Sequence, residues 1–138
     1  MKYIYMILLS FLVSGCAQLP PTAQDIQAKQ FQTLPDKAVI YIVRPRVDGA
    51  VQGPLSFTGG MISTHQGTYY RWEVAPGTQR IEGAGASSAA VTVQAEAGKI
   101  YFVEHTVNGN VRDGLLSMSL RRIDDNRGRR MVTDATLL

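Results

Sequence analysis

Cysteine and histidine are scarce in this sequence, which has one cysteine and two histidines in 138 residues. Because a sole cysteine has no partner within the chain, an internal disulfide is excluded. A zinc site needs three or four converging ligands, and His65 and His105 are far apart with no second cysteine to help them. We therefore expect no metal site and no metal cofactor.

A strong excess of charge of one sign is also missing. The chain has 14 basic and 11 acidic residues, for a formal net charge of +3. Removing residues 1–15 takes away Lys2 and no acid, which leaves 13 basic residues against 11 acids and a net charge of +2. This excess is too small to predict a nucleic-acid partner.

No apolar run is long enough to span a membrane permanently. The only candidate, Tyr3–Val13, is apolar apart from Ser10 and the tyrosine hydroxyls. Eleven residues are too few for about 30 Å of hydrocarbon. With Lys2 as a positive start, the pattern is typical of a short export signal.

The residues after this run resemble a lipobox, the cleavage and lipidation signal of bacterial lipoproteins. They read Val13-Ser14-Gly15-Cys16, with two small residues before the only cysteine. The motif predicts a signal peptide over 1–15 and a diacylglycerol on the thiol of Cys16; a secreted protein with a stray cysteine is the alternative. Because Ala17 rather than Asp follows, we expect a lipid anchor at the periplasmic face of the outer membrane in a Gram-negative bacterium.

Residues 16–36 are predicted to form the lipidated N-terminus and a flexible tether. Five glutamines and three prolines lie between residues 17 and 36, with little apolar periodicity. A flexible coil of 20 residues reaches roughly 25 Å. A short helix from Asp25 to Gln32, with Thr22 or Asp25 near its start, is the alternative.

From Lys37 onward the sequence alternates between β-type runs and turns. Turns are predicted at Gly59-Gly60 and at Ala75–Thr78, after which Thr78–Gly83 would return antiparallel. The spacing predicts an all-β domain over 37–138, a small antiparallel β-sandwich of about 7–8 strands or a small barrel. The end, Arg127–Leu138, fits an edge strand, a short helix or a frayed tail. The predicted strands are Lys37–Arg44, Leu55–Thr58, Met61–Thr64, Thr68–Val74, Thr78–Gly83, Ala89–Ala95, Lys99–Val107 and Leu115–Ile123.

Three segments behind the lipobox resemble a family of bacterial lipoprotein domains, domain-of-unknown-function family 2846. They are AVIYIVRP (38–45), TYYRWEVAPGTQRIEG (68–83) and VQAEAGKIYFVEH (93–105), and the resemblance covers residues 37–123. It implies a compact β-sandwich on a lipid tether, with no known reaction and no catalytic residues. The DG-containing hairpin expected in many relatives is replaced here by FTGGMISTHQGTYY (57–70).

Motifs for catalysis are weak, and we expect no catalytic residues and no cofactor. There is no GxSxG elbow, and Gly83–Ser88 fits a loop better than a phosphate cradle. Asp124–Gly128 fits a polar hairpin turn better than a calcium loop. Glu104 and His105 are adjacent on a strand and so point to opposite faces, with His105 expected half-exposed at the strand end.

Aromatic residues concentrate in two strands. Alternation places Tyr70 and Trp72 in the core. Tyr69 and Tyr101 are candidates for an exposed face that stacks on a peptide or glycan, with ordinary packing as the favoured alternative.

Basic residues concentrate near the C-terminus. A hairpin turned at Asp124–Gly128 would bring them to one face, where guanidinium groups suit phosphate or carboxylate. The partners would be an anionic envelope lipid or glycan, or an acidic envelope protein; the alternative is a solvated edge that discourages aggregation. The residues are Arg121, Arg122, Arg127, Arg129 and Arg130.

Together these patterns predict a non-enzymatic, lipid-anchored envelope module that binds or scaffolds a partner in the periplasm. The second hypothesis is an accessory assembly component of an envelope or secretion machine. A glycan-modifying or hydrolytic enzyme is less favoured, because such an enzyme needs convergent polar residues in one concave pocket.

Overall fold

The computed structural model describes residues 19–49, 52–83, 89–110 and 115–138, which form nine strands and two short helices. The expected signal peptide, Cys16 and Ala17, and most of the Gly83–Ser88 loop lie outside these residues. The elements are α2 (Ala23–Ala28), β1 (Ala38–Val43), β2 (Gly53–Phe57), β3 (Gly60–Thr64), β4 (Thr68–Val74), β5 (Gly77–Gly83), β6 (Ala90–Ala95), β7 (Ile100–Asn110), β8 (Leu115–Ile123), α3 (Asp125–Thr133) and β9 (Thr136–Leu137).

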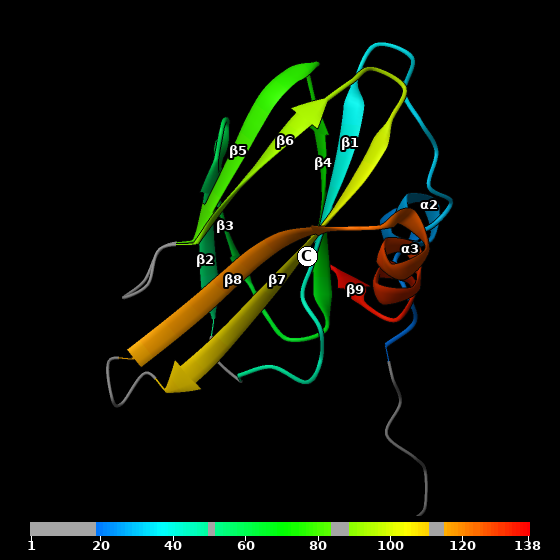
Figure 1. The fold of residues 1–138 in the computed structure, drawn as a ribbon. Coiled ribbons are helices and arrows are strands. Elements are labelled where there is room, and N and C mark those ends of the chain that lie inside the picture. The colour runs from blue at the N-terminus through cyan, green and yellow to red at the C-terminus, as the bar shows by residue number, and fades with distance from the viewer. Residues whose placement is uncertain (1–18, 50–51, 84–88, 111–114) are drawn as a thin grey trace, which may run out of the picture.

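The strands form two sheets, which confirms the all-β sandwich (Figure 1). One sheet has the order β8-β7-β1-β4-β9, and the other has the order β3-β2-β5-β6. Most pairs are antiparallel, as expected, but β1 pairs with β7 and β4 pairs with β9 in parallel. The sandwich is therefore mixed, because the chain crosses to the second sheet before β7 returns beside β1.

Strand β1 lies at the centre of the larger sheet, and all six of its residues are buried. One set of alternating side chains, including Ile40 and Ile42, packs between the sheets with Trp72. The other set, including Tyr41, packs under the helices with Phe102. Because both faces are covered, the strand is a continuous apolar run, as its sequence predicts.

Helices α2 and α3 lie on the outer face of the five-stranded sheet and make a third layer (Figure 1). The hairpin turn expected at Asp124–Gly128 is wrong, because these residues begin α3. Asp124 is the N-cap, and its carboxylate accepts a hydrogen bond from the backbone N–H of Arg127 at 2.9 Å. Asp is a favoured N-cap residue because its oxygen satisfies an N–H that has no partner within the helix.

The expected tether is too long, because residues from Thr22 onward are docked on the domain. Thr22 caps α2 by accepting from the N–H of Asp25 at 3.1 Å. The buried carboxylate of Asp25 accepts from the Tyr69 hydroxyl at 2.8 Å and the Leu137 N–H at 3.0 Å, and it pairs with Lys29 at 3.0 Å. Burial alone would raise the pKa of Asp25, but these donors outweigh it and lower the pKa. The alternative prediction, a short helix with Thr22 near its start, is the one that the structure has, although the helix runs over Ala23–Ala28 rather than to Gln32.

Both predicted turns exist, and one of them connects different partners from those expected. The β2–β3 hairpin closes through Thr58 and Gly59, one residue earlier than Gly59-Gly60. The turn before Gly77 does not fold β5 back on β4. Strand β5 instead joins the other sheet, where it pairs with β2 and β6. Ala75–Thr78 is thus a corner between the two layers.

Candidate functional site

The aromatic face expected from Tyr69 and Tyr101 is not formed. Tyr69 is fully buried beneath α2, so its proposed exposure is wrong. Tyr101 is half-buried against the inter-sheet core, and its hydroxyl accepts from the Glu96 N–H at 3.1 Å. Trp72 is buried and Tyr70 packs beside it, as predicted. These aromatic side chains therefore serve packing.

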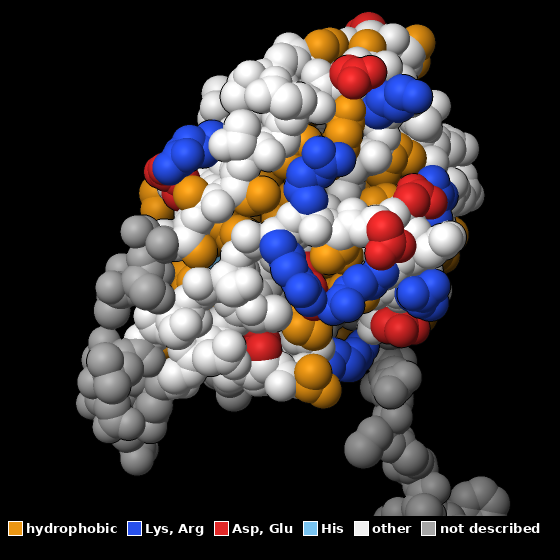
Figure 2. Space-filling view, viewed as in Figure 1, with side chains coloured by type: hydrophobic (Ala, Val, Ile, Leu, Met, Phe, Trp, Pro, Cys, Tyr) orange, Lys and Arg blue, Asp and Glu red, His pale blue; other side chains and the backbone are white. Residues whose placement is uncertain are grey.

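The arginines near the C-terminus come together on β8 and α3, although a helix rather than a hairpin presents them (Figure 2). The carboxylate of Glu104, buried on β7, lies between two of them. One Glu104 oxygen accepts from Arg121 Nε at 2.6 Å, and the other accepts from Arg127 at 2.8 Å. These ion pairs were not predicted from the sequence, because they join residues on three separate elements, β7, β8 and α3.

Two of the three remaining arginines also have partners, and acids lie among the basic side chains (Figure 2). Arg129 pairs with Asp125 at 2.7 Å and lies over the Phe31 ring at 4.8 Å. Arg122 lies over the Tyr101 ring at 5.2 Å. Arg130 is exposed in the last turn of α3, where a cation favours the helix C-terminus. Five arginines against Glu104, Asp124 and Asp125 leave a net charge of +2, which is a weak attraction for an anion.

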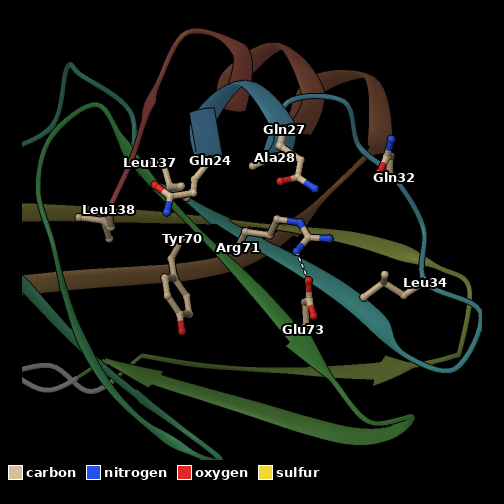
Figure 3. A pocket seen from close by; sticks show the side chains of 10 residues that line it. All are labelled: Gln24, Gln27, Ala28, Gln32, Leu34, Tyr70, Arg71, Glu73, Leu137 and Leu138. Carbon is tan, nitrogen blue, oxygen red and sulfur yellow. Dashed lines mark hydrogen bonds and ion pairs between the residues drawn. The ribbon is translucent and has the colours of Figure 1, made fainter. Parts of the chain in front are cut away.

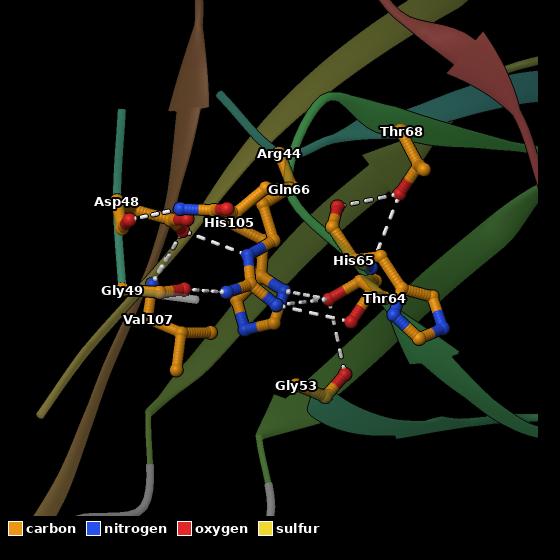
Figure 4. Close-up of polar contacts among 10 residues, drawn as sticks. All are labelled: Arg44, Asp48, Gly49, Gly53, Thr64, His65, Gln66, Thr68, His105 and Val107. Atoms are coloured by element: carbon orange, nitrogen blue, oxygen red, sulfur yellow. Dashed lines mark hydrogen bonds and ion pairs between the residues drawn. The ribbon is translucent and has the colours of Figure 1, made fainter. Parts of the chain in front are cut away.

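A second polar cluster lies buried at one end of the sandwich, and the sequence analysis missed it (Figure 4). At its centre is Arg44, 1% exposed, directly after β1. Its Nε donates to Asp48 at 2.8 Å, one terminal nitrogen donates to the Thr64 carbonyl at 3.0 Å, and the other donates to the Gly49 carbonyl. A buried guanidinium persists only when its donors are satisfied in this way.

Asp48 connects the cluster to β7. The same carboxylate oxygen that binds Arg44 also accepts from the Val107 N–H at 2.9 Å. The next residue, Gly49, donates its N–H to the Val107 carbonyl at 2.7 Å. A Cβ on Gly49 would lie 2.8 Å from that carbonyl oxygen, so the close approach requires glycine. The loop after β1 is thereby fixed against β7.

His105 belongs to this cluster and is fully buried, so its expected half-exposed position is wrong. Strand β7 runs to Asn110, which places His105 in mid-strand. The Thr64 hydroxyl donates to the Gly53 carbonyl at 3.1 Å, so it accepts from His105 Nδ1–H at 3.0 Å. Burial, reinforced by the Arg44 charge and opposed by Asp48, lowers the pKa of His105 to about 4. The imidazole is therefore neutral at physiological pH.

The cluster is suited to holding the fold rather than to chemistry on a bound molecule. Within the described residues, His105 Nε2 and one oxygen of Asp48 lack a hydrogen-bond partner, but both atoms are sealed from solvent. The side chain of Arg44 is fully covered and that of Asp48 is 4% exposed, so a substrate has no access. The sequence signal was a charged pair, Arg44 and Asp48, four residues apart beside a proline.

Stability should fall as the pH drops from about 6.5 to about 4. His105 has a pKa of about 4 in the fold, whereas the unfolded chain has the usual value of about 6.5 and binds the proton first. The contribution of neutral His105 to the free energy of unfolding is fully present above pH 6.5. As the pH falls from 6.5 to 4, up to roughly 3 kcal/mol of it is lost. Urea denaturation at stepped pH should show this slope, and His105→Asn should flatten it.

The exposed His65 provides the control, because His65→Asn should leave the slope unchanged. A slope that survives His105→Asn would contradict the assignment.

No family model matches the chain, and no curated protein matches it.

The described residues contain no group of three or more His, Cys, Asp or Glu side chains placed to hold a metal ion. In the same part of the chain, no helix is both long and apolar enough to cross a membrane.

Proposed function

We propose that this chain is a lipid-anchored protein of the bacterial envelope whose β-sandwich binds or scaffolds a partner without catalytic chemistry. The proposal starts from Val13-Ser14-Gly15-Cys16, in which small residues precede the only cysteine at the end of an apolar run. On this proposal the mature chain begins at Cys16 and carries diacylglycerol on its thiol. Ala17 favours the periplasmic face of the outer membrane.

The position of α2 is the observation that carries the proposal furthest. The docked domain begins at its N-cap, Thr22, six residues after Cys16. Six residues reach at most about 22 Å. A lipid on Cys16 would therefore keep the domain within about two nanometres of the bilayer, with the layer of α2 and α3 next to the anchor. Because the link is short and Asp25 fixes α2 to the domain, the anchor would restrict how the domain is oriented relative to the bilayer.

The polar clusters support a binding or scaffolding role over a hydrolytic one. An enzyme needs titratable groups that converge on an accessible pocket. Here the cluster of Arg44, Asp48 and His105 is closed to solvent, and Glu104 is committed to two arginines. Their geometry is that of side chains that position loops and helices.

Replacing Cys16 with serine should abolish anchoring. Serine lacks the thiol that receives diacylglycerol, so the unlipidated precursor should accumulate and retain residues 1–15. Metabolic labelling with a fatty acid and membrane fractionation measure both effects. Ser14→Ala is the matched control, because it keeps a small residue before the cysteine and should mature normally. Normal maturation and labelling of the Cys16→Ser chain would overturn the proposal.

A further inference from the structure

Among the described strands, none pairs with the outer edge of β4 beyond Tyr69. Strand β9 pairs with β4 only at Thr68 and Tyr69. The Thr68 carbonyl accepts from Arg44 on the β1 side, whereas the Tyr69 carbonyl accepts from the Leu138 N–H on the outer side. Because these directions alternate along a strand, the backbone N–H and C=O groups of Arg71 and Glu73 point outward. Such an edge is a template for another strand.

A groove of about 390 Å³ lies beside this open edge (Figure 3). Its floor includes the side chains of Arg71 and Glu73, which form an ion pair. Glutamines from α2 and the segment after it form the opposite wall and leave room for the side chains of an added strand. The wall residues include Gln24, Gln27, Gln32 and Leu34.

We propose that this edge binds the same edge of a second copy, so that the two β4 strands pair antiparallel about Trp72. The open span runs from Tyr70, where β9 ends, to Val74, where β4 ends. Trp72 is its midpoint, so self-pairing there uses the whole span. Beyond Val74 the chain leaves this sheet for β5 of the other sheet, so the proposed ladder stops before the residues that pair with β9.

The charges select this register. Pairing about Trp72 places Arg71 opposite the partner's Glu73, and the two-fold axis repeats the contact with the roles exchanged. Each of these pairs exchanges two backbone hydrogen bonds, since their N–H and C=O groups face outward. A slip of two residues would place Arg71 opposite the partner's Arg71, and like charges directly opposite each other are destabilising. The edge is thus complementary to itself in one register.

The arrangement is compatible with two anchors in one bilayer, and in this respect it rests on the proposed function. Antiparallel strands in one sheet are related by a two-fold axis perpendicular to that sheet. Both α2 helices, which the chain enters six residues after Cys16, therefore lie on the same face of the joined sheet. Confinement to a membrane raises the effective concentration of the two chains. This favours a dimer that is held by only a few backbone hydrogen bonds.

The register is tested by disulfide trapping in cell membranes. Two full-length chains with different tags, one Arg71→Cys and one Glu73→Cys, are produced together. Directly opposite residues in a hydrogen-bonded pair lie about 5.5 Å apart, within disulfide range, whereas diagonal neighbours lie about 7–8 Å apart. We expect the mixed-tag dimer as the main crosslinked product, with same-tag dimers reduced to the wild-type background.

Wild-type chains separate the two proposals. Their only cysteine is Cys16, so wild-type crosslinking would report a free thiol and contradict lipidation while leaving the β4 pairing open to the same test. Same-tag dimers equal to mixed-tag dimers, no dimer, or trapping of an unrelated extended peptide by the Glu73→Cys chain would each overturn the pairing with a second copy.

Charge reversal provides an independent test with intact cysteines. Arg71→Glu or Glu73→Arg alone places like charges opposite each other, so each should lose the dimer when energy transfer is measured between differently labelled full chains in the same liposomes. The double variant Arg71→Glu and Glu73→Arg restores opposite charges and should regain it. A double variant that stays monomeric while the wild type is dimeric would overturn the charge-selected register.

Discussion

Replacing Arg44 with methionine should cost about 3–5 kcal/mol of unfolding free energy. Methionine fills much of the same volume but removes the positive charge that pairs with the carboxylate of Asp48. The side chain of Asp48 is only 4% exposed, so water cannot replace that charge. The carbonyls of Gly49 and Thr64 also lose their donors. Because small domains are stable by about 5–15 kcal/mol, this is a large fraction of the total. Urea denaturation of the purified chain measures the loss.

Arg46→Met is the matched control for this prediction. Arg46 is exposed, and within the described part of the chain its guanidinium donates to the backbone carbonyl of Asp134, at 3.0 and 3.3 Å. Its loss should cost less than about 1 kcal/mol. Adding Asp48→Asn to Arg44→Met should recover part of the loss, because the unpaired buried charge is removed. Equal costs for Arg44→Met and Arg46→Met would show that the buried cluster does not carry the stability assigned to it.

Gly128→Ala should destabilise the domain by about 2–3 kcal/mol, although alanine is the better helix former. A Cβ at this position would lie 2.1 Å from Cγ of Phe102. The Phe102 ring cannot move aside easily, because it stacks on Tyr41 with centroids 5.3 Å apart and meets Phe31 edge-on at 6.0 Å. The clash therefore outweighs the gain in helix propensity, and α3 must lift from the sheet.

Asn126→Ala, at an exposed position of the same helix, separates the two effects. It should leave stability unchanged or raise it by a few tenths of a kcal/mol. Pairing Gly128→Ala with Phe102→Leu should lose less than the two single changes added together, since the smaller side chain removes the clash. Chemical denaturation gives all four values. A Gly128→Ala chain as stable as Asn126→Ala would refute the close packing of α3 on Phe102.

The parts of the fold that were predicted from the sequence depend on local patterns. The apolar run of β1 indicated a strand covered on both faces, and the alternation around Trp72 indicated which side chains face the core. The bounds of β8, Leu115–Ile123, follow from the same pattern. An alternation with a period of two residues can be recognised from neighbouring positions alone, without information on contacts between distant segments.

The sheet assignments could not be read in this way. The proline–glycine corner before β5 looks like a hairpin turn, but it moves the chain to the other sheet. The parallel pair of β1 and β7 joins segments far apart in the chain. Local turn chemistry fixes how the backbone bends, whereas the packing of whole layers decides which strands become neighbours.

The errors in the candidate site have a common physical cause. Asp124–Gly128 has the composition of a turn, and it forms a helix because Gly128 lets the backbone approach the Phe102 ring. His105 looked like a strand-end residue, and it is buried because the loop holding Asp48 folds over β7. Asp25 looked like a tether residue, and it is buried by partners on β4 and β9. Each outcome depends on a contact between distant segments.

The most direct test of the proposed lipid anchor is the intact mass of the wild-type chain extracted from membranes. We expect the loss of residues 1–15 and an added diacylglycerol on Cys16, with fragment masses that place the lipid on the first residue of the mature chain. A mass that retains residues 1–15, or a mature chain with a free thiol at Cys16, would contradict it.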